Sequence, residues 1–217
     1  MTGCCVKNSG SRRHDIARLC RHHDALIIED DVYDCVHDTA LPPLVTLAPE
    51  RTFYVSSLSK TLSPGLRIGA LAPPQGFMQA ARDALLSASL MIAPLSYAMM
   101  AQWMLDGTAA SVRQSLRGEA GRRRALALSV LGPHLAPPPY DAFHAWMPMP
   151  LARARWFGAE AAKQGVKVTL PQPFMACARA DAQAGIRLCL GPTALPDLRE
   201  ALHRLRHVLD GMNNSVT

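Results

Sequence analysis

A short run of apolar residues that ends abruptly in acids places the strongest constraint on the fold of this chain. Ala25-Leu26-Ile27-Ile28 stops at Glu29-Asp30-Asp31, and a segment of helical character, residues 12–23, comes before it. A wholly apolar run after a helix is typical of a buried strand in a parallel sheet, with the acids at its carboxyl end. Open α/β sheets bind their ligands at that end. The sequence therefore predicts an α/β fold with a candidate ligand site after residue 28.

Two more apolar runs follow, and the first of them leads to a lysine. Residues 53–56 and 68–72 are predicted strands, and Ser57-Leu58-Ser59-Lys60 lies between them. Such a lysine can be a surface residue, part of a phosphate loop, the S-x-x-K element of serine acyl-enzymes, or a cofactor-binding lysine. The glycines that a phosphate loop needs are absent before Lys60. The KTG element that accompanies S-x-x-K in acyl-enzymes is absent too.

The stretch from Ser57 to Gly69, SLSKTLSPGLRIG, resembles the cofactor-lysine motif of class I/II, fold-type-I aminotransferases, which use pyridoxal 5'-phosphate. The resemblance implies that Lys60 is the catalytic residue and forms a Schiff base with the cofactor. It also implies that Ser57 and Arg67 bind the cofactor phosphate, for which a guanidinium fork and a hydroxyl are suitable donors. The released Lys60 amine would then move a proton between the substrate Cα and the cofactor.

Two further segments resemble the same family. Glu29-Asp30-Asp31-Val32-Tyr33 resembles a strand end that carries an aspartate and a tyrosine. This implies that Asp30 pairs with the pyridine nitrogen and that Tyr33 hydrogen-bonds the phenolic oxygen of the ring. Residues 185–190 resemble the strand whose arginine binds the substrate α-carboxylate, which implies that role for Arg187. An arginine inside an apolar strand is costly unless it meets an anion; an edge-strand arginine that faces water is the alternative.

A proline-rich stretch at residues 133–139 marks a change in composition, and we take it as a domain boundary. Residues 1–132 are predicted to be an incomplete cofactor-binding large domain, with a mostly parallel sheet and an interdomain helix. Residues 133–217 are predicted to be a small C-terminal α+β domain. Its expected elements are strands at 142–147, 166–170 and 186–190 and helices at 152–164 and 195–209.

Composition favours a soluble, cytoplasmic protein. Hydrophobic residues make up 49% and charged residues 18% of the chain, as in ordinary globular proteins. The six cysteines form neither a pair of CxxC motifs nor a secreted disulfide framework, and Cys20 beside His22 and His23 is read as a helix face, so no metal is expected. Residues 1–10 lack the apolar core of a signal peptide. Residues 84–105 are uncharged, but Pro94 interrupts them, which predicts two short buried helices and no membrane partner.

The formal charge of +6 does not by itself indicate a nucleic-acid partner. The densest basic patch, residues 113–124, has the spacing of a solvated helix face. The family resemblance implies an amino-acid or keto-acid substrate and a homodimer in the full-length form. The same motifs resemble the aminotransferase-like module of MocR-type transcriptional regulators, which is fused to a winged-helix domain and senses the cofactor or an amine. A lyase or decarboxylase on this scaffold also remains open.

The beginning of the chain departs from the family pattern. Thr2-Gly3 resembles the end of the family's Asn-Pro-Thr-Gly motif, with Met1 in place of proline. The family's upstream glycine-rich loop, its ring-stacking aromatic residue and several strands are then expected to be missing. Residues 141–144 also stand where relatives tend to have a glycine pair. Because a sheet without its first strands exposes apolar edges, we expect a marginally stable chain that binds the cofactor weakly.

Overall fold

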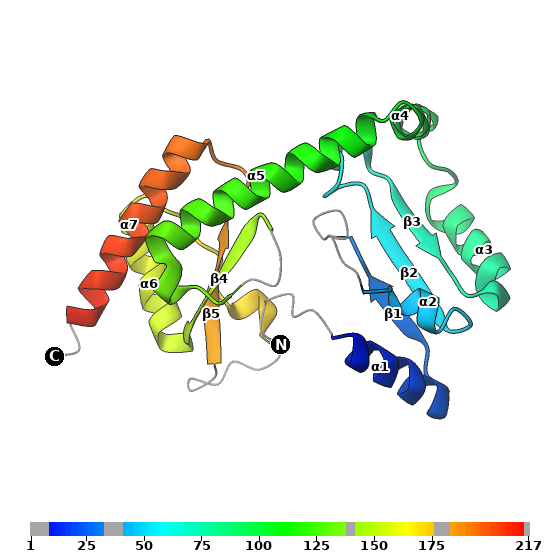
Figure 1. The fold of residues 1–217 in the computed structure, drawn as a ribbon, viewed down its shortest axis with the longest axis horizontal. Helices are drawn as coiled ribbons and strands as arrows, with labels where there is room; N and C mark the ends of the chain where they lie inside the picture. The colour runs from blue at the N-terminus through cyan, green and yellow to red at the C-terminus, as the bar shows by residue number, and fades with distance from the viewer. Residues whose placement is uncertain (1–8, 33–40, 138–141, 176–182, 215–217) are drawn as a thin grey trace. The chain divides into compact units, whose positions relative to one another are not determined.

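The computed structural model describes residues 9–32, 41–137, 142–175 and 183–214 (Figure 1). The chain forms two compact units, of which one comprises residues 7–116 and the other contains residues 117–217. The division between them falls within the long helix α5 (Thr108–Leu131). The domain boundary predicted between residues 132 and 133 stays a prediction.

The N-terminal unit contains a three-stranded sheet in the order β1-β2-β3. Strands β1 (Ile27–Asp30) and β2 (Thr52–Ser57) are parallel, and β3 (Gly69–Ala72) runs antiparallel to β2. The three predicted strands are therefore confirmed. Asp30 lies opposite Val55, and Ser57 lies opposite Gly69. The carboxyl ends of β1 and β2 and the first residue of β3 consequently share one end of the sheet.

Two helices cover one face of β1, as the ribbon of Figure 1 shows. They are α1 (Gly10–His22), whose first turn is capped by the Ser9 hydroxyl, and the short α2 (Leu44–Leu47). A small core of Ala17, Ile27, Leu44 and Ala48 fills the space between them and the strand. The prediction that this run is a buried strand was wrong for one of its two faces. Ile27 is buried but Ile28 is 77% exposed, because in the described part of the chain only one face has a helical cover.

Helices α3 (Met78–Ser89) and α4 (Pro94–Leu105) occupy the uncharged stretch after β3. The predicted break is confirmed, and Pro94 begins α4, where the missing N–H of proline costs nothing. The prediction that both helices are buried was wrong: neither has a buried residue, and Leu105 is 85% exposed. An apolar surface of this extent is typical of a face that packs against another polypeptide. None of the helices in the described ranges is long and apolar enough to cross a membrane.

The C-terminal unit is an α+β unit, as predicted. Strands β4 (His144–Pro150) and β5 (Gln183–Cys189) are antiparallel, and helices α6 (Leu151–Lys163) and α7 (Leu195–Asn214) cover one side of them. Its core includes Phe157, Ile186 and Leu202, which are almost completely buried. The strand predicted at 166–170 is reduced to a single bridge between Thr169 and Arg187. Short 3-10 helices lie in both units, at Pro64–Leu66, Gln75–Phe77, Gly132–His134 and Gln172–Phe174.

A buried arginine attaches α5 to the loop after β5. The Arg123 guanidinium donates to the carbonyl oxygens of Leu190 and Thr193, both at 2.6 Å, and to Glu119. Hydrogen bonds from Arg122 and Arg123 hold the pKa of Glu119 below its usual value. The reading of residues 113–124 as a solvated face is therefore wrong for Arg123, which is only 9% exposed because it satisfies backbone carbonyls.

We predict that Gly185→Ala destabilises the C-terminal unit. A Cβ at this position would lie 2.5 Å from the Trp146 ring and 2.7 Å from the Met147 carbonyl oxygen, closer than packed atoms approach. The free energy of unfolding should fall by about 1–3 kcal/mol, the usual cost of overpacking. Urea denaturation of Gly211→Ala is the matched control, since a Cβ at this helical glycine meets nothing within 4 Å. Equal stability of the two variants would contradict the packing.

A second prediction concerns the ion pair between Arg21 at the end of α1 and Glu50 after α2. Arg21 donates to Glu50 at 2.8 and 3.2 Å, and these bonds lower the pKa of the Glu50 carboxyl to about 2. Because the folded-state pKa is depressed, the stabilisation is present above the unfolded-state pKa and is lost as pH falls towards 2. Glu50→Gln should lower the free energy of unfolding by about 0.5 kcal/mol at neutral pH, as for exposed pairs. Urea titrations should show a smaller difference at about pH 3; a difference that grows on acidification would contradict this sign.

Candidate functional site

Four predicted site residues lie at one end of the N-terminal sheet. Asp30 is the last residue of β1 and Ser57 the last of β2. Lys60 lies in the turn that follows β2, and Arg67 lies two residues before β3 begins. The parallel pairing of β1 and β2 brings these chemically different side chains to the same edge.

The structure does not describe the two remaining predicted residues at this sheet end. Tyr33 lies outside the described residues. Arg187 belongs to β5 in the C-terminal unit, where it lies opposite Trp146 on β4. Its neighbours Ile186 and Leu188 face the core, so Arg187 is on the other face of the strand, where it is half-buried. Its backbone forms both hydrogen bonds of the bridge with Thr169.

The turn that carries Lys60 is held by its own backbone. The carbonyl oxygen of Leu58 accepts hydrogen bonds from the N–H groups of Thr61, Leu62 and Ser63. The Leu58 N–H in turn donates to the carbonyl oxygen of Ile68 at 3.1 Å, which closes the loop at the sheet. This arrangement fixes the backbone on both sides of Lys60, whose side chain is exposed.

Two hydroxyl groups flank this turn. The Ser57 hydroxyl accepts from the Ser59 N–H at 3.1 Å and is 3.4 Å from the carbonyl oxygen of Ile68, to which it donates. Thr61 is 7% exposed, and its Oγ1 atom is buried without a hydrogen-bond partner among the described residues. Because a buried hydroxyl without a partner is costly, Thr61 indicates a site whose hydrogen bonding is not complete within the described part of the chain. The motif assigns no role to Thr61, because the resemblance gives roles only to Ser57, Lys60 and Arg67 within it.

Arg67 adopts a left-handed backbone conformation, with φ 54° and ψ 40°. It ends the short helix Pro64–Leu66, whose start is capped by the Ser63 hydroxyl at 3.2 Å from the Gly65 N–H. Leu66 and Ile68 are buried on either side, which leaves the Arg67 side chain exposed. Residues other than glycine adopt this conformation at a cost of about 1–2 kcal/mol, and such strain is concentrated at functional sites.

Arg67 also lines a cavity of about 750 Å³. The walls are mainly apolar and come from β2, β3, α3 and the start of α4, for example Leu71, Met78 and Leu85. Asp30, Ser57 and Lys60 do not line this cavity. Arg67 is thus the predicted site residue that lies near the sheet end and also lines the apolar cavity beside it.

The three acids after the apolar run have three different surroundings. Glu29 is 9% exposed and faces α1 and α2, where its carboxylate accepts hydrogen bonds from Arg13, Leu44 and Val45. Asp30 points to the opposite face of β1 and is exposed. Asp31 accepts a hydrogen bond from the Tyr54 hydroxyl at 2.9 Å. Asp30 is therefore the exposed acid at the strand end, as its predicted role requires.

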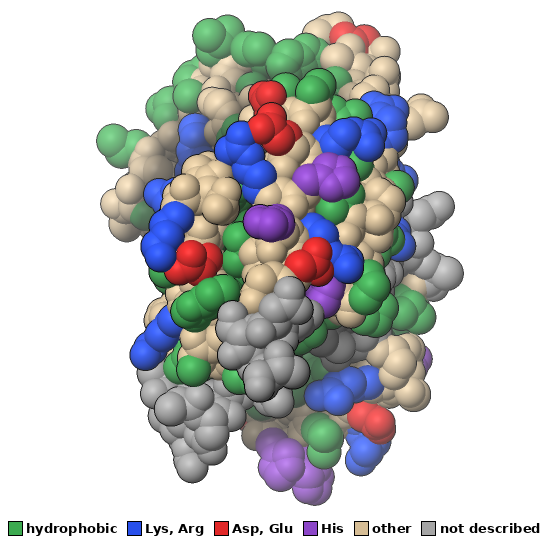
Figure 2. All heavy atoms as spheres, turned by 90° about the vertical axis from the view of Figure 1, so that its left-hand side faces the viewer, with side chains coloured by type: hydrophobic (Ala, Val, Ile, Leu, Met, Phe, Trp, Pro, Cys, Tyr) green, Lys and Arg blue, Asp and Glu red, His purple; other side chains and the backbone are tan. Residues whose placement is uncertain are grey.

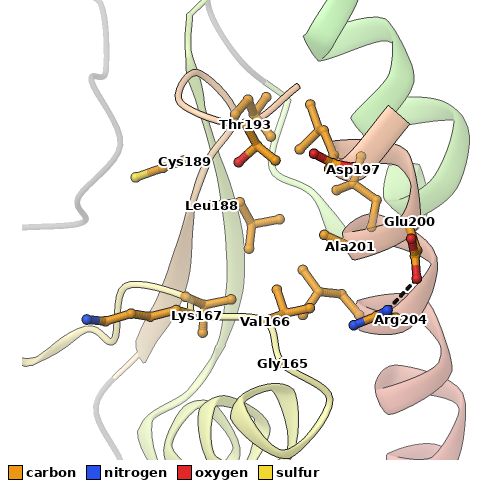
Figure 3. A pocket seen from close by; sticks show the side chains of 15 residues that line it. Gly165, Val166, Lys167, Leu188, Cys189, Thr193, Asp197, Glu200, Ala201 and Arg204 are labelled. Atoms are coloured by element: carbon orange, nitrogen blue, oxygen red, sulfur yellow. Dashed lines mark hydrogen bonds and ion pairs between the residues drawn. The ribbon is translucent and has the colours of Figure 1, made fainter. Parts of the chain in front are cut away.

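A second cavity, of about 430 Å³, lies in the C-terminal unit between residues 165–168, the end of β5 and α7 (Figure 3). Its walls include Leu188 and Leu205, and an ion pair between Glu200 and Arg204 lies at its side. Figure 3 shows the side chains of Lys167 and Cys189 directed away from the other lining residues. None of the predicted site residues lines this cavity, so it is distinct from the predicted site. Within the described ranges, no group of three or more His, Cys, Asp or Glu side chains could hold a metal ion.

Comparison with known proteins identifies the family of the chain. The family model described as "Aminotransferase class I and II" matches residues 11–207. The chain belongs to this family. The match includes both units and each of the six predicted site residues.

Relatives of two kinds match the chain. One is an uncharacterized HTH-type transcriptional regulator, YdeF of Bacillus subtilis, which is 26% identical over 94% of this chain and 44% of its own length. Another is the mitochondrial kynurenine/alpha-aminoadipate aminotransferase of Rattus norvegicus, which is 36% identical over 33% of this chain. This aminotransferase-like chain thus spans less than half the length of the regulator that it matches almost throughout.

A solved structure shows the same fold. The kynurenine aminotransferase of Pyrococcus horikoshii, in complex with PMP, aligns with a TM-score of 0.83 and 20% identity. The alignment covers 96% of this chain and 54% of that one. The chain therefore has a fold-type-I aminotransferase architecture over about half the length of such a protein, with its partial sheet and its smaller α+β unit.

We predict that Arg67→Gly is more stable than Arg67→Ala by about 1 kcal/mol, because alanine keeps the left-handed strain and glycine removes it. Both variants lose the same guanidinium, so the difference reports the backbone alone. Urea denaturation of the two variants provides the comparison. A Gly variant that is less stable than the Ala variant would show that residue 67 is not held in the left-handed conformation.

Proposed function

We propose that this chain binds pyridoxal 5'-phosphate at the end of the N-terminal sheet. We further propose that it serves transfer of an amino group between an amino acid and a keto acid. The observation that carries the proposal is the convergence of Asp30, Ser57, Lys60 and Arg67, from three strands and their connections, at one sheet end. These are an acid, a hydroxyl, an amine and a guanidinium, which is the donor set that this cofactor requires.

The residues fit the cofactor group by group. The guanidinium of Arg67 can bind a phosphate in a bidentate manner, and the hydroxyl of Ser57 is a neutral donor at the same end of the sheet. The hydroxyl of Thr61, which has no partner among the described residues, lies one residue beyond Lys60. Asp30 is an exposed carboxylate suited to a protonated pyridine nitrogen, and Tyr33 is proposed for the ring oxygen.

Each residue then has a defined task. The Lys60 amine would hold the cofactor and would take and return the proton at the substrate Cα. Asp30 keeps a proton on the ring nitrogen. Arg187 binds the α-carboxylate of the substrate with its guanidinium fork. The bound cofactor supplies an electron-accepting ring for the carbanion formed at Cα.

The proposal extends to partners and compartment. The exposed apolar residues of α3 and α4, such as Leu86 and Leu95, support a homodimer. Figure 2 shows acidic and basic side chains next to each other on the face that includes α7, which carries the ion pairs of Arg204 and Arg206. Such mixed charge supports a chain that binds no nucleic acid itself.

The unbridged thiols of Cys20 and Cys189 support a location in the cytoplasm, where amino-acid metabolism takes place.

A second candidate function is the effector-sensing, aminotransferase-like domain of a MocR-type transcriptional regulator. The match to a transcriptional regulator over 94% of the chain favours it. In that function the cofactor and an amine are bound to change a conformation, and net turnover is not required. The same residues would hold the cofactor in both cases.

Lys60→Ala should abolish covalent binding of pyridoxal 5'-phosphate. The wild-type chain with added cofactor should show the visible absorption of a lysine-bound cofactor, and borohydride should fix it to the protein. Lys163→Ala is the matched control, because Lys163 is an exposed lysine of α6 paired with Glu160. Equal borohydride-stable labelling of the Lys60→Ala and wild-type chains would contradict the proposed site.

Amino acids then distinguish the two functions. An enzyme should convert an added amino acid to its keto acid and should aminate the bound cofactor, so that the visible absorption is lost with stoichiometric product. A sensor should change its absorption on binding an amine without repeated turnover when a keto acid is also present. Arg187→Gln should weaken the response to carboxylated amines by about tenfold and leave that to amines without a carboxylate unchanged.

A further inference from the structure

Glu29 is a buried carboxylate with a complete set of partners and no part in the proposed chemistry. One oxygen accepts from the Arg13 guanidinium at 2.8 Å and from the Leu44 N–H at 2.9 Å. The other accepts from the Val45 N–H at 3.1 Å. Charge-assisted bonds of this kind are among the strongest hydrogen bonds in proteins.

These bonds join three elements at the end of β1. Arg13 comes from α1 and also donates to the carbonyl oxygen of Pro42, while Leu44 and Val45 form the first turn of α2. No side chain of Pro43 can cap that turn, so the Glu29 carboxylate satisfies its N–H groups instead. The start of α2 is thus bonded to the side chain of Glu29, which lies near the end of the preceding strand β1.

Asp30 depends on the same short segment. It is the next residue of β1, points to the opposite face, and is the last residue paired with β2. Its carboxylate accepts a local hydrogen bond from the Val32 N–H at 3.3 Å. Two sets of contacts thus act on the strand end that carries Asp30: its pairing with β2 and, on the other face, the bonds of Glu29 to α1 and α2.

We propose that Glu29 is a positioning residue for the cofactor site: it fixes the end of β1 through Arg13 and the start of α2, and so fixes Asp30. The proposal rests on the proposed function, because Asp30 must meet the ring nitrogen of a bound cofactor. Glu29 does not touch the cofactor itself. It acts through the backbone from the opposite face of the strand.

The test is Glu29→Gln in the full chain. The glutamine side chain has the same shape as the glutamate side chain, but its NH₂ group cannot accept a hydrogen bond. At least one of the buried N–H donors to Glu29 therefore loses its acceptor. We expect the dissociation constant for pyridoxal 5'-phosphate, from absorbance titration, to rise about tenfold. The change of the visible absorption with pH should move to higher pH, because a ring nitrogen held less firmly in its protonated form leaves the lysine-bound nitrogen more basic.

Glu50→Gln is the matched control. Glu50 also accepts hydrogen bonds from arginines, Arg21 and Arg51, but it is half-exposed and lies away from the end of β1. It should leave both the dissociation constant and the pH profile unchanged. If Glu29→Gln does not fold, Arg13→Gln removes one donor and keeps the carboxylate with its two N–H partners, and should raise the dissociation constant about threefold.

Two outcomes would overturn the proposal. A Glu29→Gln chain that melts at a lower temperature but keeps the wild-type dissociation constant and pH profile would show a purely structural role. Hydrogen exchange of the cofactor-free chains tests the positioning separately, and exchange at residues 30–32 should be faster in Glu29→Gln. Unchanged exchange at these residues would contradict the positioning role of Glu29, whether or not the wild-type chain binds the cofactor. A wild-type chain that binds no cofactor would instead overturn the proposed function.

Discussion

The parallel pairing of β1 with β2 is the constraint on which the candidate site depends. Residues 27–30 are paired in register with residues 52–55, so both strands end at the same edge, and β3 begins there because it returns antiparallel. This topology brings Asp30 near the turn that carries Lys60, although thirty positions separate them in the sequence. The rest is local: backbone bonds to Leu58 shape the turn, and a left-handed residue 67 starts the return strand with its guanidinium exposed.

Much of this could be predicted from the sequence, since the information is local. The apolar runs at 25–28, 53–56 and 68–72 are short, and each overlaps a strand. The break at Pro94 and the helices after residue 150 follow from proline placement and apolar periodicity in the same way. The motif around Lys60 predicted the family that the comparison confirmed. The roles of the individual site residues remain proposals.

What could not be predicted depends on which surfaces meet. The apolar run before Glu29 looks the same whether one or both faces of the strand are covered, and only the placement of α1 and α2 leaves Ile28 exposed. Likewise, residues 84–105 are apolar enough to be buried, yet burial requires a partner that composition does not specify. The sequence alone does not distinguish the three consecutive acids. Successive side chains of a strand point to opposite faces, but which face is covered depends on the helices that pack there. Position 29 has the same parity as Ile27, which is the signal that could have identified Glu29 as buried.

Borohydride reduction of the chain with pyridoxal 5'-phosphate, followed by peptide mapping, tests the central claim most directly. The chain has four lysines, at positions 7, 60, 163 and 167, so a single reduced adduct can be assigned without ambiguity. The account predicts that the peptide containing Lys60 carries the cofactor at a stoichiometry near one and that the other three lysines remain unmodified. A label spread over the lysines, or an adduct confined to a lysine other than Lys60, would contradict the assignment of the sheet end as the cofactor site.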